Sequence, residues 1–308
     1  MIALENTTYG RSVDVATLAT ASAGLLALVD RTDGRDLPAA PHYRVVGTNG
    51  LAVAQLWAGE FAAAQANLTE ALAQARALGI ALAGFSAEVY LALLDVLHGR
   101  LRRGYRRACD AQRSLDRRGW GSEVQASAGY VSLALTHLAR HQLDRAAVQI
   151  DRGLAASERG TDAGCRFVLA IATIQLAAAR GDAAAMATAA SQLEEWTSSV
   201  GRLPDLLRHW CTVAQAETLV ATGSPAAAVD LLGAPGETIG LAGRWNGWRW
   251  HAPISPWTQP SMSASFWTRC WTPPCPIASR RCRPASCVPK RSWRWGGTRL
   301  AWRPWQKR

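Results

Sequence analysis

The sequence predicts an all-α protein, built as a solenoid of helical hairpins and followed by a tail of different composition. Residues before 244 are rich in Ala, Leu and Arg and contain no Lys, a composition that favours helix because Ala and Leu lose little entropy there. Turn motifs recur along this part at an almost constant spacing, and the composition changes abruptly near Gly243. We therefore expect an N-terminal helical segment over residues 1–40, a helical-repeat domain over 41–243, and a disordered tail over 244–308 rich in Trp, Arg, Pro and Cys.

The repeat is defined by short turns between amphipathic runs. Five turns begin at positions separated by 40, 42, 40 and 42 residues, namely Gly59, Gly99, His141, Gly181 and Gly223. This spacing is close to the period of paired-helix repeats. A single hairpin cannot bury its own apolar face, so stacking of the units is needed to form a continuous core.

Each unit is expected to contain one helix before its turn and one after it. In the first unit, apolar residues follow the turn at helical spacing, at Phe61, Ala64, Leu68, Ala71, Leu72 and Ala75. In the second and third units, the helix before the turn shows the same spacing, at Val89, Leu93, Leu94 and Leu97 and at Val131, Leu135 and Leu138. Glycine-containing segments end the second helix of successive units at Gly79, at 119–122 and at 160–162.

The residues at the turns have specific conformational roles. Glycine can adopt the left-handed conformation that closes a helix, and Asp182 and Ser224 can cap the helix that follows. Pro225 is expected in the first helical turn, where a missing N–H is tolerated. His141 replaces glycine in the third unit and must either accept a positive φ or alter the turn.

Four segments resemble the tetratricopeptide-like region of MalT-type, LuxR-family bacterial transcriptional regulators: residues 51–64, 68–79, 93–103 and 117–120. The resemblance covers roughly residues 15–243 and implies a TPR-like sensor domain that takes up an inducer or a protein partner. In the family this region follows a nucleotide-binding ATPase and precedes a helix-turn-helix. Neither part is recognisable here. The phosphate-binding loop of an ATPase requires a lysine, and the only lysines are Lys290 and Lys307, in the tail. No segment after Gly243 resembles a helix-turn-helix.

The sequence contains no recognisable catalytic motif, so we expect neither an enzyme nor a cofactor. His98, His137 and His209 lie on separate helical patterns without the spacing of metal ligands. Cys109, Cys165 and Cys211 are expected to be buried free thiols, as is usual in a reducing cytosol. No leader and no apolar stretch of membrane-spanning length is evident, so a cytoplasmic location without membrane contact is expected.

Binding is instead expected on the inner, concave wall of the solenoid. A protein partner or a small-molecule inducer would contact first-helix residues there, with Tyr90, Tyr130, Gln175 and Arg208 as candidates; packing within the core is the alternative role. A basic cluster comprises Arg100, Arg102, Arg103, Arg106 and Arg107. It is either a solvated helix face or a contact for an acidic partner or a nucleic-acid backbone, although no direct nucleic-acid binding is expected from the helical body.

The tail carries the whole net positive charge of the molecule. Residues 244–308 contain 13 basic residues, no acidic residue and 10 of the 14 Trp, which leaves 21 basic against 23 acidic residues in the rest of the chain. Taken as written, the alternation of Arg with Trp would suit nucleic-acid or membrane binding, which is the alternative function. Cys270, Cys275, Cys282 and Cys287 could instead hold zinc, although their central gap is short for such a site.

A third interpretation, which we favour, is that the tail is translated out of frame. If the reading frame were displaced by one base, each codon would join the last base of one codon to the first two bases of the next. Every Trp and Cys would then become Leu, Val or Met, while Thr would become Asp, Asn, His or Tyr. Phe266, Trp267, Cys270, Trp271 and Cys275 would then form an apolar helical stripe in the style of the repeat domain.

Overall fold

The computed structural model describes residues 15–32, 37, 39–121, 123–158, 162–200 and 203–232, together with residues 294, 295, 298 and 299. The chain divides into two compact units, Met1–Pro256 and Trp257–Arg308. The described part of the first unit is all-α, as the sequence predicts, with eleven α-helices and the short 3-10 helix η2 (Val124–Ala126). None of the described helices is both long enough and apolar enough to cross a membrane.

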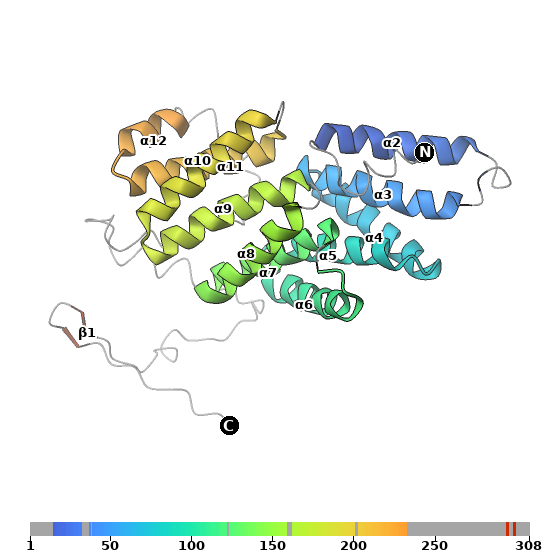
Figure 1. Ribbon diagram of the computed structural model, residues 1–308, viewed down its shortest axis with the longest axis horizontal. Coiled ribbons are helices and arrows are strands. Elements are labelled where there is room, and N and C mark those ends of the chain that lie inside the picture. Colours follow the sequence, from blue (N-terminus) through green and yellow to red (C-terminus); the bar gives the residue numbers. More distant parts are fainter. Residues whose placement is uncertain are drawn as a thin grey trace, which may run out of the picture. The chain divides into compact units, whose positions relative to one another are not determined.

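The helices follow one another with short connections (Figure 1). Their bounds are α2 Val15–Arg31, α3 Ala40–Trp57, α4 Phe61–Ala77, α5 Ala81–Leu97, α6 Leu101–Arg118, α7 Ser127–Ala139, α8 Leu143–Glu158, α9 Ala163–Arg180, α10 Ala183–Ser199, α11 Asp205–Ala221 and α12 Pro225–Leu232. The predicted N-terminal helical segment contains α2, which packs against α3, and residues 1–14 lie outside the described part.

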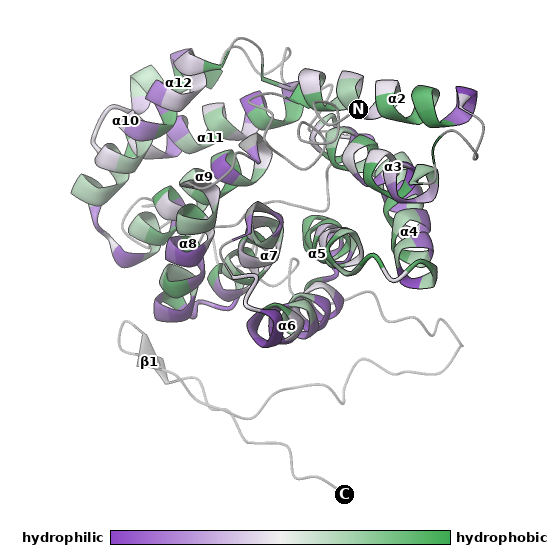
Figure 2. Cartoon of the chain, turned by 45° about the vertical axis from the view of Figure 1, so that its right-hand side comes forward, coloured by the Kyte–Doolittle hydropathy of each residue, from purple (hydrophilic) through white to green (hydrophobic). Residues whose placement is uncertain are grey.

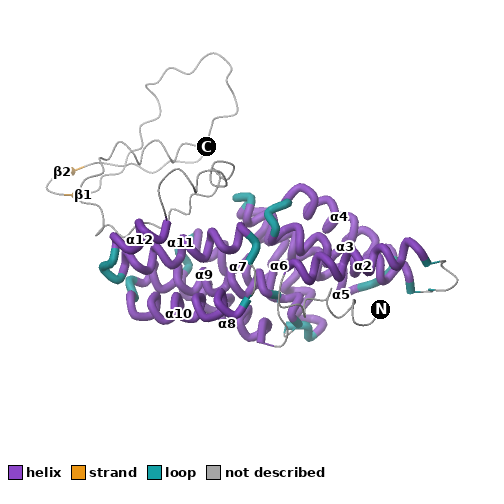
Figure 3. The backbone as a smooth tube through the Cα atoms, turned by 90° about the horizontal axis from the view of Figure 1, so that it is seen from above, coloured by secondary structure: helices purple, strands orange, loops and turns teal. Residues whose placement is uncertain are grey.

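The helices form the five predicted hairpins, α3–α4, α5–α6, α7–α8, α9–α10 and α11–α12. Each first helix contacts the first helix of the next hairpin, and each second helix from α4 to α10 also contacts the first helix of the hairpin that follows. The first helices thus form one layer and the second helices another, stacked in chain order (Figure 2). Short loops join the helices (Figure 3). This is a tetratricopeptide-like solenoid of helical hairpins.

All five predicted turns contain a residue in the left-handed conformation. The φ angles are 84° at Gly59, 76° at Gly99, 55° at His141, 72° at Gly181 and 87° at Gly223. His141 therefore accepts the positive φ that a glycine provides in the other units, and it keeps the turn unchanged. The Asp182 carboxylate accepts a hydrogen bond from the Ala185 N–H at 2.9 Å, which confirms the predicted helix cap.

The helices α5 and α7 form the centre of the core. In α7, every residue from Ser127 to His137 is buried, and α5 is buried from Phe85 to Leu97 except at Glu88. One hydrophobic cluster extends from Val15 to Ala214, through all the first helices. Small residues allow close approach, since a Cβ added at Gly104 of α6 would lie 2.5 Å from Cγ2 of Val96 in α5. The small residue at Gly104 therefore lets α6 pack closely on α5.

The tail predicted to be disordered, residues 244–308, lies outside the described residues except for two short strands. In the second unit, β1 (Arg294–Trp295) pairs antiparallel with β2 (Thr298–Arg299), with Arg294 opposite Arg299. The four tail cysteines of the zinc interpretation, Cys270, Cys275, Cys282 and Cys287, are likewise outside the described residues.

Candidate interaction surface

The most strongly charged helix of the structure is α6. It contains seven arginines and two aspartates, and it buries a narrow stripe of Gly104, Ala108, Ala111 and Leu115 against the array. Its remaining faces are hydrophilic, as Figure 2 shows. This pattern fixes the orientation of the helix, because the four small or apolar residues recur at spacings of 4, 3 and 4 and so lie on one side.

The predicted basic cluster is organised around one buried carboxylate, Asp95 of α5, whose side chain is 3% exposed. Arg100 donates from Nε to Oδ1 at 2.9 Å, while Arg103 Nε and Arg107 Nη1 each lie 3.0 Å from Oδ2. A buried carboxylate requires such partners, since an unpaired charge in the interior is strongly unfavourable. The cluster is therefore partly structural: three of its arginines hold α6 against α5.

A second acid extends this network toward α4. Glu88 pairs with Arg107 of α6 at 3.1 Å and with Arg76 of α4 at 2.8 Å. Glu88 and Asp95 are seven residues apart and lie on the same side of α5. Their carboxylates together bind arginines of α4 and of the α6 region. The sequence does indicate these two carboxylates, since Glu88 and Asp95 are the only two acids in α5.

The network leaves positive charge unmatched at the surface. Arg102 and Arg106 are exposed and make no ion pair within the described part of the chain. Together with the four paired arginines, they make six positive charges against the two carboxylates of α5. We call this group the arginine surface: Arg76, Arg100, Arg102, Arg103, Arg106 and Arg107. It carries an excess of four positive charges.

A groove of about 530 Å³ lies beside the arginine surface, between α4, α5 and the second half of α6. Its apolar lining includes Leu72, Phe85 and Ala111, and its polar lining includes Arg76, Glu88, Asp110, Ser114 and Arg118. Arg118 also stacks over the Trp120 ring at 4.9 Å, and Trp120 meets Phe85 edge to face at 5.8 Å. The groove therefore offers an apolar floor with charged rims, which suits a side chain anchored beside polar contacts.

A second cavity, of about 590 Å³, lies at the ends of α2, α3 and α4. It is lined mainly by apolar residues, including Val29, Ala77 and Leu78, and by Arg44, which pairs with Asp30 at 2.7 Å. The exposed cation is thus already neutralised, and the cavity lacks the convergent polar groups of a specific site.

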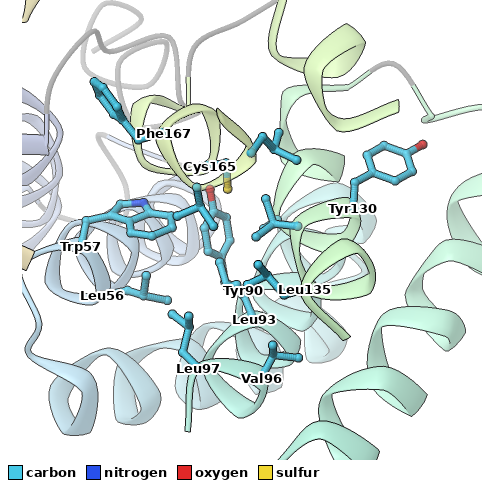
Figure 4. Packing of buried hydrophobic residues seen from close by; sticks show 14 of the residues in the cluster. Leu56, Trp57, Tyr90, Leu93, Val96, Leu97, Tyr130, Leu135, Cys165 and Phe167 are labelled. Carbon is cyan, nitrogen blue, oxygen red and sulfur yellow. The ribbon is translucent and has the colours of Figure 1, made fainter. Parts of the chain in front are cut away.

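Tyr90 and Tyr130, which the sequence offered as ligand contacts or as core residues, are buried in the structure. Tyr90 is 4% and Tyr130 5% exposed, and both belong to the hydrophobic core (Figure 4). The Tyr130 hydroxyl donates to the Gly121 carbonyl at 3.1 Å, and burial raises the pKa of this side chain. Both tyrosines therefore have the packing role that the sequence left open. The reason is that α5 and α7 are covered on almost every side, so they present no open wall.

The other two candidates lie on helices that carry none of the arginine surface. Gln175 is half-buried on α9, and its Oε1 is buried without a hydrogen-bond partner. Arg208 is exposed on α11 and forms an ion pair with Asp205 one turn earlier. Two of the four predicted ligand residues are therefore core residues, and the other two lie on α9 and α11.

A buried polar centre that the sequence did not reveal lies at the start of α9. Asp162 accepts a hydrogen bond from the Cys165 N–H at 2.9 Å and caps the helix. Burial raises the pKa of this carboxyl from 3.8 to about 6. The rise is opposed by the N–H groups of Cys165 and Gly164 and by the nearby Trp57 indole, although the indole N–H makes no hydrogen bond with a described residue. Figure 4 shows Trp57 and Cys165 among the packed side chains of this region.

Burial keeps the buried thiols and the buried histidine uncharged near neutral pH. Burial raises the pKa of Cys165 above its ordinary range and that of Cys211 to about 11, so both thiols stay protonated near neutral pH. Burial also lowers the pKa of His137, whose Nδ1 lies 2.7 Å from Gln142 Oε1. Among the described residues, no group of three His, Cys, Asp or Glu side chains is placed to hold a metal ion.

No protein-family model and no curated protein matches the chain. A solved structure, the crystal structure of BtubC (BKLC) from P. vanneervenii, is similar with a TM-score of 0.48 and 17% sequence identity. The similarity covers 81% of this chain and 96% of that chain.

Proposed function

We propose that the chain is a non-enzymatic helical-repeat domain that binds an acidic protein partner through the arginine surface and the adjacent groove. The observation that carries the proposal is the unmatched positive charge of Arg102 and Arg106 on a helix held rigidly by the Asp95 network. Complementary charge steers a partner toward such a surface, and the apolar floor of the groove can take an anchoring side chain.

We further propose that this domain is the sensor region of a MalT-like, LuxR-family transcriptional regulator and acts in the cytoplasm. The support is the resemblance of the repeat segments, together with an array of paired helices, an architecture that commonly serves protein binding. In such a regulator, a partner or inducer on this domain would change the state of an ATPase and a DNA-binding domain.

The binding proposal can be tested with a labelled twelve-residue peptide of Glu and Leu, titrated with the full chain and followed by fluorescence anisotropy. The double variant Arg102→Glu with Arg106→Glu is expected to weaken binding at least tenfold, because it reverses two exposed charges without touching the Asp95 network. Arg152→Glu is the matched control, since Arg152 is exposed on α8 and makes no ion pair with another described residue.

Two outcomes would count against the proposal. Equal loss of binding in the control and in the double variant would mean that net charge alone attracts the peptide. Preferential binding of duplex DNA with the same dependence on Arg102 and Arg106 would assign the surface to nucleic acid. The regulator assignment is tested separately, since it requires neighbouring reading frames that encode an ATPase and a helix-turn-helix.

A further inference from the structure

The last hairpin, α11–α12, exposes apolar side chains that an array of this kind normally buries. Val229 is 66% exposed, Val220 44% and Leu231 40%. We call these three residues the end surface. A repeat that terminates a solenoid needs a polar outer face for solubility, and the end surface does not provide one.

The repeat register shows that one of these positions is buried elsewhere. The residue three positions before each turn is Leu56, Val96, Leu138, Ala178 or Val220. Leu56 and Val96 are 0% exposed, and Leu138 and Ala178 pack half-buried against the core. Val220 has the same residue type as Val96 and the same place in its hairpin, so its exposure of 44% reflects its surroundings rather than its sequence.

A second position shows which element can cover this side of a hairpin, since it is exposed at Gln65 but half-buried at Tyr105, Ala147 and Ala187. The residue six positions after each turn is Gln65, Tyr105, Ala147, Ala187 or Val229. The Tyr105 ring lies 5.7 Å from the His137 ring, and the Arg140 guanidinium lies over it at 4.4 Å. His137 belongs to α7, the first helix of the next hairpin. By this register, the first helix of a sixth hairpin would cover Val229.

We infer that the end surface is the docking site for a sixth helical hairpin, encoded by the DNA of residues 244–308 read one base earlier. Several of its residues do not depend on codon choice, because Trp has the single codon TGG and Phe has only TTT and TTC. In the displaced frame, the codon at Trp267 specifies Leu and the codon at Thr268 specifies Asp.

This Leu-Asp pair falls where the repeat predicts the start of a second helix. In the third hairpin, Leu143 and Asp144 begin α8 two residues after the turn position His141. Position 265 lies two residues before 267 and 42 residues after Gly223, a spacing that the body itself uses twice. The displaced frame therefore places a sixth turn at the spacing of the other five.

The displaced frame also restores an amphipathic pattern. Trp271 becomes Leu and Cys270 becomes Leu, Val or Met, so positions 267, 270 and 271 form an apolar stripe at helical spacing. Because G from the preceding TGG becomes the first base, Asn246 becomes Glu, while Thr258 and Thr272 become Asp. These changes return acids to a segment that contains none as written.

The test compares the chain as written with a frame-restored chain, in which the displaced frame is translated from codon 244 onward. Hydrogen exchange of α11 and α12 is measured by mass spectrometry in both. We expect amide exchange in α12 to be at least tenfold slower in the frame-restored chain, because the sixth hairpin covers the end surface.

A pair of variants makes this result specific. Val229→Asp should speed exchange in α12 at least tenfold in the frame-restored chain and change it less than twofold in the chain as written, where Val229 is already exposed. Val148→Asp is the matched control, since Val148 is 47% exposed on α8 and should be neutral in both chains.

Three outcomes would overturn the inference. Equal exchange of α12 in the two chains would show that the displaced frame supplies no covering hairpin. Strong protection of α12 in the chain as written would show that its own tail covers the surface. Protection that rises with protein concentration would show that a second copy of the chain does so.

Discussion

The middle of the array and its last hairpin have the same turn register but differ in burial. In α5 and α7, side chains such as Leu93 and Val131 are 0–1% exposed, whereas Val229 and Leu231 of α12 are 66% and 40% exposed. The helices of both regions are rich in Ala, Leu and Val, so helix propensity does not account for the difference. What differs is the number of neighbouring hairpins, which is the property that determines stability in a linear array.

Truncation of one leucine in each region gives the largest expected contrast. Leu93→Ala should lower the free energy of unfolding by about 2–5 kcal/mol, because it leaves a cavity in a core that cannot collapse around it. Leu231→Ala should change it by less than about 0.5 kcal/mol. Urea denaturation of both variants measures the difference, and equal effects would mean that the two regions are equally well packed.

The pH dependence of stability distinguishes the interior from the exposed end through Asp162. Its pKa rises from 3.8 to about 6 on folding, so the folded chain holds this proton more firmly than the unfolded chain. The stability gained from the neutral carboxyl is full below about pH 4 and is lost as the pH rises through about 6. A difference of about two pKa units corresponds to roughly 3 kcal/mol.

Asp162→Asn keeps a cap for α9 and removes the charge. The variant should gain up to about 3 kcal/mol relative to the unmodified chain between pH 4 and pH 7.5, as measured by urea denaturation at both values. An exposed acid of the last hairpin, Asp230, serves as the control, and Asp230→Asn should show no comparable gain. A gain of similar size at both pH values for Asp162→Asn would argue against the buried carboxyl as its cause.

Two glycines test how closely the interior helices are packed. A Cβ at Gly164 would lie 2.1 Å from Cε2 of the buried Trp57, so Gly164→Ala should destabilise the chain by about 1–3 kcal/mol. At Gly84 the nearest atom would be Ala75 Cβ at 3.4 Å, and Gly84→Ala should be neutral or stabilise by up to about 1 kcal/mol through helix propensity. Thermal unfolding of both variants checks the contrast, and a stabilising effect of Gly164→Ala would contradict it.

The smallest effect is expected at the turns. His141→Gly should stabilise the chain by about 0.5–1 kcal/mol, because glycine adopts φ 55° without the strain of a side chain. Gly99→Ala, at φ 76°, should destabilise it by about 1 kcal/mol for the converse reason. Chemical denaturation resolves changes of this size, and destabilisation by His141→Gly would point to a side-chain contact that outweighs the strain.

The hairpin fold could be predicted from the sequence because its determinants are local. Glycine and the spacing of apolar residues define each turn and the two helices around it. At His141, which replaces a glycine, the sequence left two possibilities, a positive φ or an altered turn. The burial of Tyr90 and Tyr130 was not predictable in this way. It depends on how tightly successive first helices pack, which is set by contacts between residues far apart in the sequence.

The arginine cluster was predictable as a group of charges but not as an arrangement. The sequence places five arginines within eight positions, from Arg100 to Arg107. It does not show that Asp95, on the preceding helix, binds three of them and leaves Arg102 and Arg106 unpaired. That division depends on which face of α6 packs on α5, and Gly104, which approaches Val96 closely, lies on this face.

The contact between Trp57 and Gly164 has a consequence for the evolution of the array. Solenoids commonly gain and lose whole repeats, since each unit touches only its neighbours. Here an indole from the first hairpin lies against the first turn of the fourth hairpin, so the contact links units that are not adjacent. Deletion or duplication of a hairpin between them would move Gly164 out of reach of Trp57. We therefore expect the segment from α3 to α9 to keep its number of units wherever this contact is kept.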